Sequence, residues 1–198
     1  MLSILIPTYN REPFLIKNIR LLSDYIRKGN LQAEIEIIIS NNHSNDNTDR
    51  SIKLFQRNNS DILIHYFSQK ENIGLEKNAL FVLSKAEGEY VMFLGDDDYV
   101  EFEYLIECLK YIKTNKGELN CIIPANVPID EQGQRLPGGR DIKLPTKKFK
   151  RGFKNCLRNS WRGHQLSGLI LKKDNLYNEY KKNNVNNIYL FIFFVAYS

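Results

Sequence analysis

The sequence predicts an α/β fold in which a mostly parallel sheet is flanked by helices. Short apolar runs alternate with segments whose apolar residues recur at helical spacing, a pattern typical of parallel strands joined by helical crossovers. Residues 35–40 include three consecutive isoleucines, as expected for a strand buried on both faces. Residues 90–94 form a similar apolar run, and three consecutive aspartates follow it after Gly95. We therefore expect polar chemistry where the strands of this sheet end.

Strands and helices are expected to alternate regularly through residue 123. We expect strands at residues 2–6, 35–40, 62–67, 90–94 and 119–123. We expect helices at residues 11–28, 49–58, 75–85 and 101–113. Pro7 is expected to stop the first strand because its nitrogen cannot donate a hydrogen bond, and Gly29 is expected to close the first helix.

The character of the sequence changes after residue 123. Residues 124–145 hold four prolines and three glycines, which is typical of a long loop, and one more strand is expected at 168–172. We therefore divide the chain into a core, residues 1–123, and a smaller, less regular C-terminal region of the same domain, residues 124–198. Residues 188–197 are strongly apolar but too short to span a membrane, which favours a buried helix or an interfacial segment.

Charge and cysteine content narrow the class of protein. The chain of 198 residues has a formal net charge of +5, and its second half holds 17 Lys/Arg against 9 Asp/Glu. Cys108, Cys121 and Cys156 are widely spaced and form no CxxC pair, so neither a zinc site nor a disulfide framework is indicated. The cysteine pattern favours a reducing, cytoplasmic setting.

Asp96, Asp97 and Asp98 give the strongest chemical signal in the sequence. They follow an apolar strand, and ligands of open α/β sheets bind at the carboxyl ends of the strands. Three adjacent carboxylates call for a cation, and Mg²⁺ or Mn²⁺ with phosphate oxygens is the expected occupant. The alternative is a solvated acidic turn, because aspartate is favoured in turns.

Three further polar segments follow the other predicted strands. They have the sequences SILIPTYNR at residues 3–11, EIIISNNHSNDNT at residues 36–48 and NIGLEKNA at residues 72–79. Together with the aspartates, these segments resemble glycosyltransferase family 2, a large group of nucleotide-sugar transferases. The resemblance covers residues 2–115 well and the remainder loosely. It implies a GT-A fold with a Rossmann-like sheet and an acceptor-side region formed by the C-terminal residues.

The resemblance implies how the donor nucleotide would be held. Pro7, Thr8 and Tyr9 would face the base and ribose, although a strand ended by a proline turn is the alternative for this segment. Asn41 stands where the family usually has an acid that accepts the uracil N3–H. An asparagine carbonyl can accept the same bond, but its amide would also suit another base, so a uridine diphosphate sugar is expected without being fixed. Asp46 and Thr48 are interpreted as helix-capping residues.

The resemblance also implies the phosphate and metal contacts. Gly74 would allow close backbone approach at the start of a helix, whose N-terminus favours an anionic pyrophosphate, with Lys77 as the phosphate partner. Asp97 is the expected principal ligand of Mn²⁺ or Mg²⁺. Asp96 would face ribose or metal, and Asp98 would contact the metal shell or the sugar. The metal would neutralise the departing diphosphate.

The catalytic base has no clear motif. Inverting members of the family use an acid from the later part of the domain to remove the acceptor hydroxyl proton. We take Asp98 and Asp174 as catalytic candidates, although Asp174 could equally be a surface charge. His164, on an acceptor-side loop, is a substitute base, and a structural histidine is the alternative for it. The end of the chain resembles a helix in the middle of the domain of relatives. We therefore expect a truncated or unusually short chain.

A basic tract lies within residues 143–162, with Phe149, Phe153 and Trp161 among its cations. A solvated basic helix, contact with an anionic membrane surface, and nucleic-acid binding are the competing interpretations. Nucleic acid is not expected because no known binding module accompanies the charge.

The sequence as a whole predicts an inverting transferase that moves a sugar from a nucleotide diphosphate to a glycan or polyprenyl-linked glycan. We expect it in the cytoplasm, with peripheral contact at the inner face of the plasma membrane. The alternative is a non-catalytic or truncated nucleotide-sugar-binding remnant. Nucleotidyl transfer is disfavoured because the loop after the first strand has no glycine.

Overall fold

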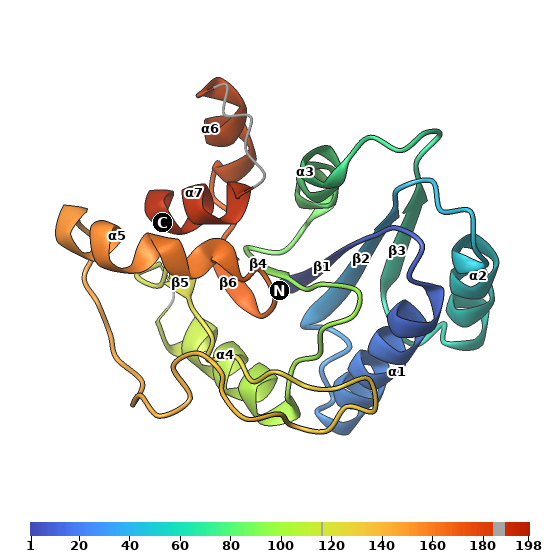
Figure 1. The fold of residues 1–198 in the computed structure, drawn as a ribbon, viewed down its shortest axis with the longest axis horizontal. Coiled ribbons are helices and arrows are strands. Elements are labelled where there is room, and N and C mark those ends of the chain that lie inside the picture. The colour runs from blue at the N-terminus through green and yellow to red at the C-terminus, as the bar shows by residue number, and fades with distance from the viewer. Residues whose placement is uncertain (116, 184–188) are drawn as a thin grey trace.

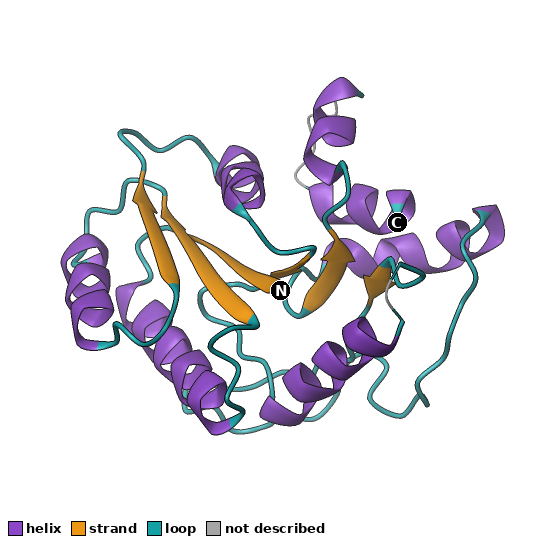
Figure 2. Cartoon of the chain, turned by 180° about the vertical axis from the view of Figure 1, so that it is seen from behind, coloured by secondary structure: helices purple, strands orange, loops and turns teal. Residues whose placement is uncertain are grey.

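The computed structural model describes residues 1–115, 117–183 and 189–198 (Figure 1). Its sheet has six strands in the order β3-β2-β1-β4-β6-β5. Figure 2 shows the sheet from behind, with helices on both of its faces. The predicted α/β fold with a mostly parallel sheet is confirmed.

The strands are short and, in the centre of the sheet, fully buried. Their bounds are β1 Leu2–Thr8, β2 Ile35–Asn41, β3 Ile64–Ser68, β4 Tyr90–Phe93, β5 Cys121–Ile122 and β6 Leu169–Lys172. The first four run parallel to one another, whereas β6 runs antiparallel to both of its neighbours, β4 and β5. Since β6 lies between β4 and β5, the C-terminal region contributes a strand to the sheet that residues 1–123 begin.

The helices match the predicted ranges closely in the first part of the chain. Their bounds are α1 Glu12–Lys28, α2 Thr48–Asn58, α3 Leu75–Lys85, α4 Phe102–Thr114, α5 Phe153–Asn159, α6 Leu176–Lys182 and α7 Leu190–Tyr197, with a 3₁₀ helix η1 at Ser160–His164. Helices α1, α2 and α4 pack on one face of the sheet, and α3, α6 and α7 pack on the other. Two apolar clusters therefore enclose the central strands.

Pro7 does not stop the first strand, contrary to the sequence prediction. Strand β1 continues to Thr8, and Pro7 pairs with Ser40 of β2. The Leu5 carbonyl accepts a hydrogen bond from Leu94 on the β4 side, and the alternation of the strand points Pro7 to that same side. Because the β4 ladder has already ended there, the missing N–H of Pro7 costs no hydrogen bond.

The apolar C-terminal helix is part of the core. Four residues of α7 are buried: Leu190, Phe191, Phe194 and Val195. Phe191 meets the ring of Phe93 in β4 edge-on, with ring centroids 4.9 Å apart, and Phe194 stacks on the same ring at 5.8 Å. The interpretation as a buried helix is confirmed for the residues described, and Ile188 lies outside them. Among the described residues, no helix combines the length and apolar character needed to cross a bilayer.

Candidate active site

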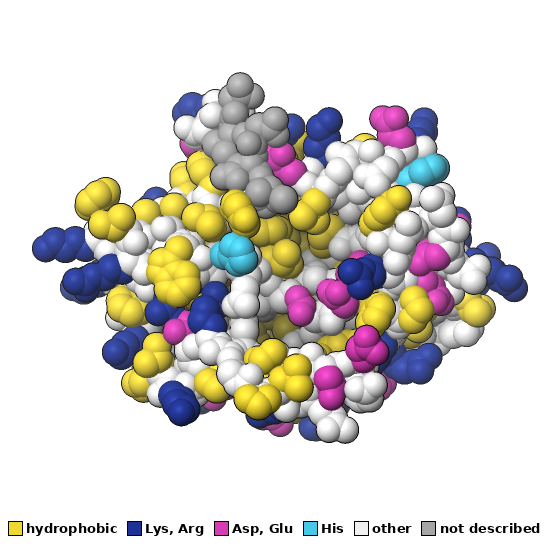
Figure 3. Space-filling model, in the orientation of Figure 1, with side chains coloured by type: hydrophobic (Ala, Val, Ile, Leu, Met, Phe, Trp, Pro, Cys, Tyr) yellow, Lys and Arg dark blue, Asp and Glu magenta, His cyan; other side chains and the backbone are white. Residues whose placement is uncertain are grey.

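The carboxyl ends of β1, β2 and β4 meet at one edge of the sheet. Thr8 pairs with Asn41 at the ends of β1 and β2, and Phe93 ends β4 immediately before the loop that carries the three aspartates. Figure 3 shows acidic side chains gathered at a hollow in the middle of the molecule, next to a cationic side chain. Neighbouring parallel strands thus bring residues separated by about 90 positions to one place, as the 88-residue separation between Thr8 and Asp96 illustrates.

Asp96 is the most constrained of the three aspartates. The Thr8 hydroxyl donates a hydrogen bond of 2.6 Å to its carboxylate. Burial raises the pKa of Asp96; the bond from Thr8 opposes this increase, and the negative charge of Asp97 adds to it. A bound cation would favour the ionised carboxylate and lower its pKa again.

Asp97 and Asp98 present their carboxylates in different ways. The Asp97 side chain is 44% exposed and forms an ion pair with Arg11 at 3.4 Å. The Ser167 hydroxyl, from the segment before β6, donates a hydrogen bond to the Asp98 carboxylate. The same hydroxyl oxygen accepts the Gly95 backbone N–H at 2.9 Å. Ser167 therefore fixes both the start and the end of the aspartate loop.

A fully buried asparagine on α1 binds the backbone of the aspartate loop. Asn18 of α1 donates from its amide nitrogen to the backbone carbonyls of Gly95, at 3.0 Å, and Asp98, at 2.7 Å. A side chain at Gly95 would displace this arrangement, because a Cβ there would lie 2.8 Å from Asp98 Oδ2 and 3.2 Å from Ser167 Oγ. The acidic loop is thus held by specific contacts and differs from a freely solvated turn.

Asn41 is buried at the end of β2, where it organises the following loop. Its carbonyl oxygen accepts the Ser44 backbone N–H at 2.9 Å, and its amide nitrogen donates to the Tyr66 hydroxyl at 3.0 Å. Tyr66 donates in turn to Asp49 at 3.0 Å. Burial raises the pKa of Tyr66 to about 12, so this hydroxyl keeps its proton at neutral pH. The Asn41 carbonyl retains one lone pair for a ligand.

Asp46 contacts the first turn of α2, although Asn47 and not Asp46 is the residue at the N-cap. Its carboxylate accepts the Thr48 backbone N–H at 3.0 Å, in the first turn of α2. The other carboxylate oxygen accepts the Glu12 backbone N–H at 3.1 Å, at the start of α1. Asp46 therefore ties together the helices that follow β1 and β2.

The start of α3 lies at the same edge of the sheet, after β3. Gly74 has a φ of +83°, in the left-handed region that favours glycine, and it is exposed. The Asn42 carbonyl oxygen accepts the Ile73 N–H at 2.8 Å, which fixes the loop before the helix. Lys77 is exposed in the first turn. The helix thus offers backbone N–H groups and a cation on the side where the aspartates lie.

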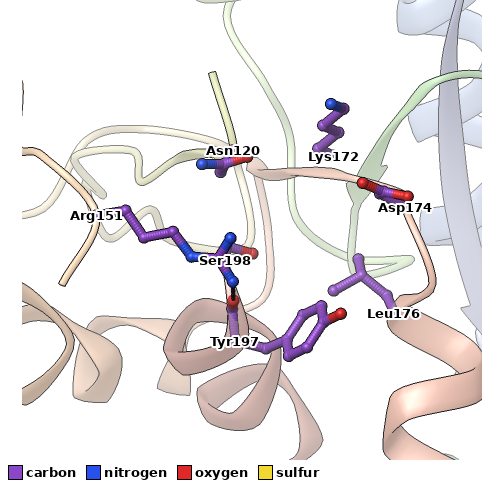
Figure 4. Close-up of a pocket in the computed structure, with 7 residues that line it drawn as sticks. All are labelled: Asn120, Arg151, Lys172, Asp174, Leu176, Tyr197 and Ser198. Carbon is purple, nitrogen blue, oxygen red and sulfur yellow. Dashed lines mark hydrogen bonds between the residues drawn. The ribbon is translucent and has the colours of Figure 1, made fainter. Parts of the chain in front are cut away.

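The structure does not bring Asp174 to this edge. Lys172, at the end of β6, pairs with Tyr90 at the beginning of β4, whereas the aspartates follow the opposite end of β4. The four-residue strand alone separates the two ends by about 10 Å. Asp174 instead lines a separate small pocket with Arg151 and Tyr197 near the C-terminus (Figure 4). The cause is the antiparallel direction of β6, which carries Ser167 to the aspartates and Asp174 away from them.

Arg11, Asn18 and Ser167 take part in the site without having been predicted for it. Asn18 left a signal, since it falls on the buried face of α1 between Leu15 and Leu22, where a polar residue needs a partner. Ser167 left no local signal, because 69 residues separate it from Asp98. His164, the substitute base, is exposed at the end of η1, with its ring 5.2 Å from that of Tyr189.

The residues fit a cation that arrives together with phosphate. In the part of the chain that the structure describes, no group of three or more His, Cys, Asp or Glu side chains converges in a metal-binding cluster. Magnesium commonly takes only one or two carboxylates from the protein and completes its shell with phosphate oxygens and water. The exposed carboxylate of Asp97 and the adjacent Asp98 match that requirement.

A sequence model described as Glycosyl transferase family 2 matches residues 3–173. The chain belongs to this family. The match includes the four segments at the strand ends and continues through β6. The C-terminal region up to residue 173 is therefore part of the family fold.

Two bacterial relatives have related sequences. The chain is 37% identical over 121 residues to abequosyltransferase RfbV of Salmonella typhimurium, a match covering 61% of this chain and 35% of that protein. It is 30% identical over 154 residues to the GalNAc(5)-diNAcBac-PP-undecaprenol beta-1,3-glucosyltransferase of Campylobacter jejuni, covering 75% and 47%. The chain thus matches less than half the length of each relative.

Solved structures of other glycosyltransferases share the fold. Staphylococcus aureus TarS, residues 1–349, superposes with a TM-score of 0.70 at 22% identity, covering 99% of this chain and 55% of that one. TarS in complex with UDP-GlcNAc gives 0.65 at 21% identity, covering 98% and 53%. The Pyrobaculum calidifontis mannosyltransferase PcManGT, in complex with GDP-Man and Mn²⁺, gives 0.60 at 16% identity, covering 90% and 46%.

Proposed function

We propose that this chain binds a nucleotide-diphosphate sugar at the carboxyl edge of its sheet and transfers the sugar to a glycan hydroxyl. The observation that carries the proposal is the joining of β1, β4 and β6 at the aspartates, through the bonds from Thr8 to Asp96 and from Ser167 to Asp98. Such a loop is pre-organised for a ligand, because its carboxylates are fixed before the ligand arrives.

The donor is proposed to be a UDP-sugar. Pro7, Thr8, Tyr9 and Asn41 would hold the base and ribose, since Pro7, Thr8 and Asn41 lie at the adjoining ends of β1 and β2 and Tyr9 directly follows β1. The fold likeness to the UDP-GlcNAc complex of TarS supports uridine, whereas the GDP-Man complex of PcManGT leaves guanosine open. Gly74 and Lys77 would contact the diphosphate at the start of α3.

A divalent cation, Mn²⁺ or Mg²⁺, is proposed to accompany the donor, as the Mn²⁺ in PcManGT suggests. Asp97 and Asp98 would hold it, and it would neutralise charge that develops on the leaving diphosphate. Thr8 keeps Asp96 in place, and Asn18 keeps the loop backbone from shifting. Arg11 balances the charge of Asp97 when no cation is present.

We propose inversion at the anomeric carbon, with Asp98 as the catalytic candidate at this edge. Asp174 is not given that role because it lies at the other end of β6. The acceptor is proposed to be a glycan or polyprenyl-linked glycan, as the name of the Campylobacter jejuni relative suggests. We place the reaction in the cytoplasm, with the chain in peripheral contact with the inner face of the plasma membrane. We retain the division at residue 123 into a donor core and an acceptor-side region.

Calorimetric titration of UDP into the purified chain with Mn²⁺, and again with EDTA, tests the donor site. Binding that requires the metal would support the proposal. Absence of binding in both conditions, repeated with GDP, would reject it. A second candidate function, a nucleotide-sugar-binding protein without catalysis, is favoured by the absence of Asp174 from the edge. Donor consumption in the presence of acceptor-containing membranes distinguishes the two.

Replacing Ser167 with alanine is expected to weaken metal-dependent UDP binding by about 10-fold, because residues that orient metal ligands typically contribute that much. The variant loses the hydroxyl that joins Asp98 to the Gly95 N–H. Calorimetry measures the change. Ser84→Ala is the matched control, since its hydroxyl bonds only the Phe81 carbonyl on the exposed side of α3. Equal affinities for the two variants would contradict the role given to Ser167.

Asn41→Asp is expected to increase the preference for UDP over GDP, because a carboxylate accepts the uracil N3–H more strongly and cannot donate to another base. The expected change in the ratio of dissociation constants is on the order of 10-fold. Competition of the two nucleotides for the metal-loaded chain measures it. An unchanged ratio would mean that Asn41 serves only the loop after β2.

UDP binding is expected to weaken as the pH falls, because protonation removes the negative charge of Asp96. The pKa of Asp96 is raised above the ordinary carboxyl value of 3.8, so this loss should begin at a higher pH than for an ordinary aspartate. In the metal-free fold, a raised carboxyl pKa means that protonation stabilises the folded chain, so Asp96 itself does not drive acid unfolding. Titrations at descending pH, each with a thermal unfolding curve, separate lost binding from lost fold. Binding that falls only where the chain unfolds would contradict this expectation.

A further inference from the structure

A surface on residues 147–162 combines exposed apolar side chains with a high positive charge. We call it the basic aromatic surface. Its apolar members are Phe149, Phe153, Leu157 and Trp161, which are 58%, 80%, 69% and 51% exposed. Its cations are Lys147, Lys148, Lys150, Arg151, Lys154 and Arg158. Residues 142–173 contain no acid to neutralise them. Figure 3 shows cationic and apolar side chains side by side at the end of the molecule where Figure 1 places α5.

The apolar members lie along one side of a helix that has no buried residue of its own. Phe153, Leu157 and Trp161 are spaced four residues apart through α5 and η1, which puts them on one face. The indole N–H of Trp161 already donates to the Arg158 carbonyl at 2.8 Å. The indole can therefore enter an apolar phase without leaving a polar atom unpaired.

The fold holds this helix in place from the other side. The Arg151 guanidinium donates to the Tyr197 carbonyl at 3.1 Å, at the end of the buried helix α7. The Asn155 amide donates to the Lys150 carbonyl at 2.7 Å, which closes the turn before α5. The exposed stripe is thus presented by an ordered element, and its exposure results from the packing of α5 against α7 and η1.

We propose that the basic aromatic surface docks on an anionic lipid bilayer. The four apolar side chains would enter the boundary between headgroups and acyl chains, while the lysines and arginines contact lipid phosphates. Charge complementarity selects this occupant. A second copy of the chain is disfavoured, because a symmetric contact would set the same cations against one another. Nucleic acid is disfavoured because no known nucleic-acid-binding module accompanies the charge.

The docked surface would lie close to the donor site. Trp161 precedes Ser167 by six residues, which span at most about 20 Å when extended, and Ser167 bonds Asp98. An acceptor anchored in the same bilayer would then be presented near the aspartates. This presentation of an acceptor rests on the proposed donor site. Docking itself specifies the membrane contact of the proposed function and does not depend on the donor site.

Trp161 provides a direct signal, because the chain contains one tryptophan. Vesicles of phosphatidylglycerol mixed with phosphatidylcholine are expected to shift its emission to shorter wavelength and to sediment with the chain. Pure phosphatidylcholine is expected to do neither. Phe153→Ser with Leu157→Ser should lower the partition coefficient by about 100-fold, roughly 10-fold for each side chain that no longer inserts. Both positions are exposed, so the fold should be kept.

Charge and location are tested by two further variants. Lys147→Gln, Lys150→Gln and Lys154→Gln together should lower partitioning by roughly 5-fold per residue. The matched control carries the same kinds of change on exposed residues of α2 and the β3–α3 loop, namely Leu54→Ser, Arg57→Gln and Lys70→Gln. It should bind vesicles as the unaltered chain does.

Four results would overturn the proposal. Vesicle binding could be absent, or equal for the Phe153 and Leu157 variant and the α2 control. A duplex oligonucleotide could shift the Trp161 emission more strongly than anionic vesicles, which would assign the surface to nucleic acid. A concentration-dependent dimer that shields Trp161, without vesicle binding, would assign it to a second copy. UDP binding is measured in a separate titration. A chain that fails to bind UDP could still bind vesicles, and a chain that fails to bind vesicles could still bind UDP, so the two proposals fail independently.

Discussion

Replacing Asp97 with asparagine is expected to abolish metal-dependent binding of UDP. The substitution removes the exposed carboxylate charge, and a metal ion that bridges protein and diphosphate contributes several kcal/mol, so the loss should reach at least roughly 100-fold. Metal-independent binding should be kept, because Thr8 and Asn41 are untouched. Calorimetry with Mn²⁺ and with EDTA measures both quantities on the same preparation.

A matched control separates metal binding from the loss of an ion pair. Asp61 is a similarly exposed aspartate paired with an arginine, Arg27, at 2.8 Å, and Arg27 lies in the last turn of α1, whereas Arg11 precedes its first turn. Asp61→Asn makes the same chemical change away from the strand ends. It should leave UDP binding intact, and thermal unfolding of both variants should stay close to that of the original chain. If Asp97→Asn binds UDP and Mn²⁺ as Asp61→Asn does, the metal site lies elsewhere.

Glu36→Ala is expected to lower the free energy of unfolding by about 4 kcal/mol, because three donors at a buried site lose their acceptor. Glu36 is 0% exposed, and its carboxylate accepts the Ser3 hydroxyl at 2.5 Å and the N–H groups of Glu87 and Gly88 at 2.8 and 3.1 Å. These bonds fix the turn that feeds β4. A chain of this size should lose roughly 10 °C in melting temperature, which calorimetry or circular dichroism measures.

Two controls identify the cause of that loss. Glu36→Gln keeps a carbonyl acceptor for the same three donors, so it should recover most of the stability if hydrogen bonding is responsible. Glu34→Ala removes a nearby glutamate whose ion pair with Lys113 is partly exposed, and it should cost less than about 1 kcal/mol. Equal melting temperatures for Glu36→Ala and Glu34→Ala would show that the buried carboxylate does not hold the turn.

The two halves of the sheet differed in how well they could be predicted. Helices α1 to α4 lie within two residues of the expected ranges, because each carries its own apolar periodicity and packs on the nearest strands. Strand β5 is only Cys121–Ile122, shorter than the expected 119–123. The order of β4, β6 and β5 left no trace in local sequence, because the pairing partners of β6 are about 50 to 80 residues away.

The site shows the same division. The carboxylates of Asp96, Asp97 and Asp98, and the strand that ends before them, were recognisable because a polar cluster at the end of a buried strand is a local pattern. The supports of that cluster were not, since Asn18 and Ser167 reach it from a helix far before it and a loop far after it. The position of Asp174 at the other end of β6 left no local signal for the same reason.

The sequence by itself determined the α/β class, the first four strands and helices, and the position of the acidic loop along the chain. These features depend on residue periodicity, turn chemistry and short-range hydrogen bonds, and each of these involves residues within about a dozen positions of one another in the sequence. Only the tertiary structure decided that β6 enters antiparallel, and with it that Ser167 meets Asp98 while Asp174 lies at the opposite end of the sheet. Strand direction is settled by the packing of the whole core, because either direction of β6 would bury the same apolar side chains.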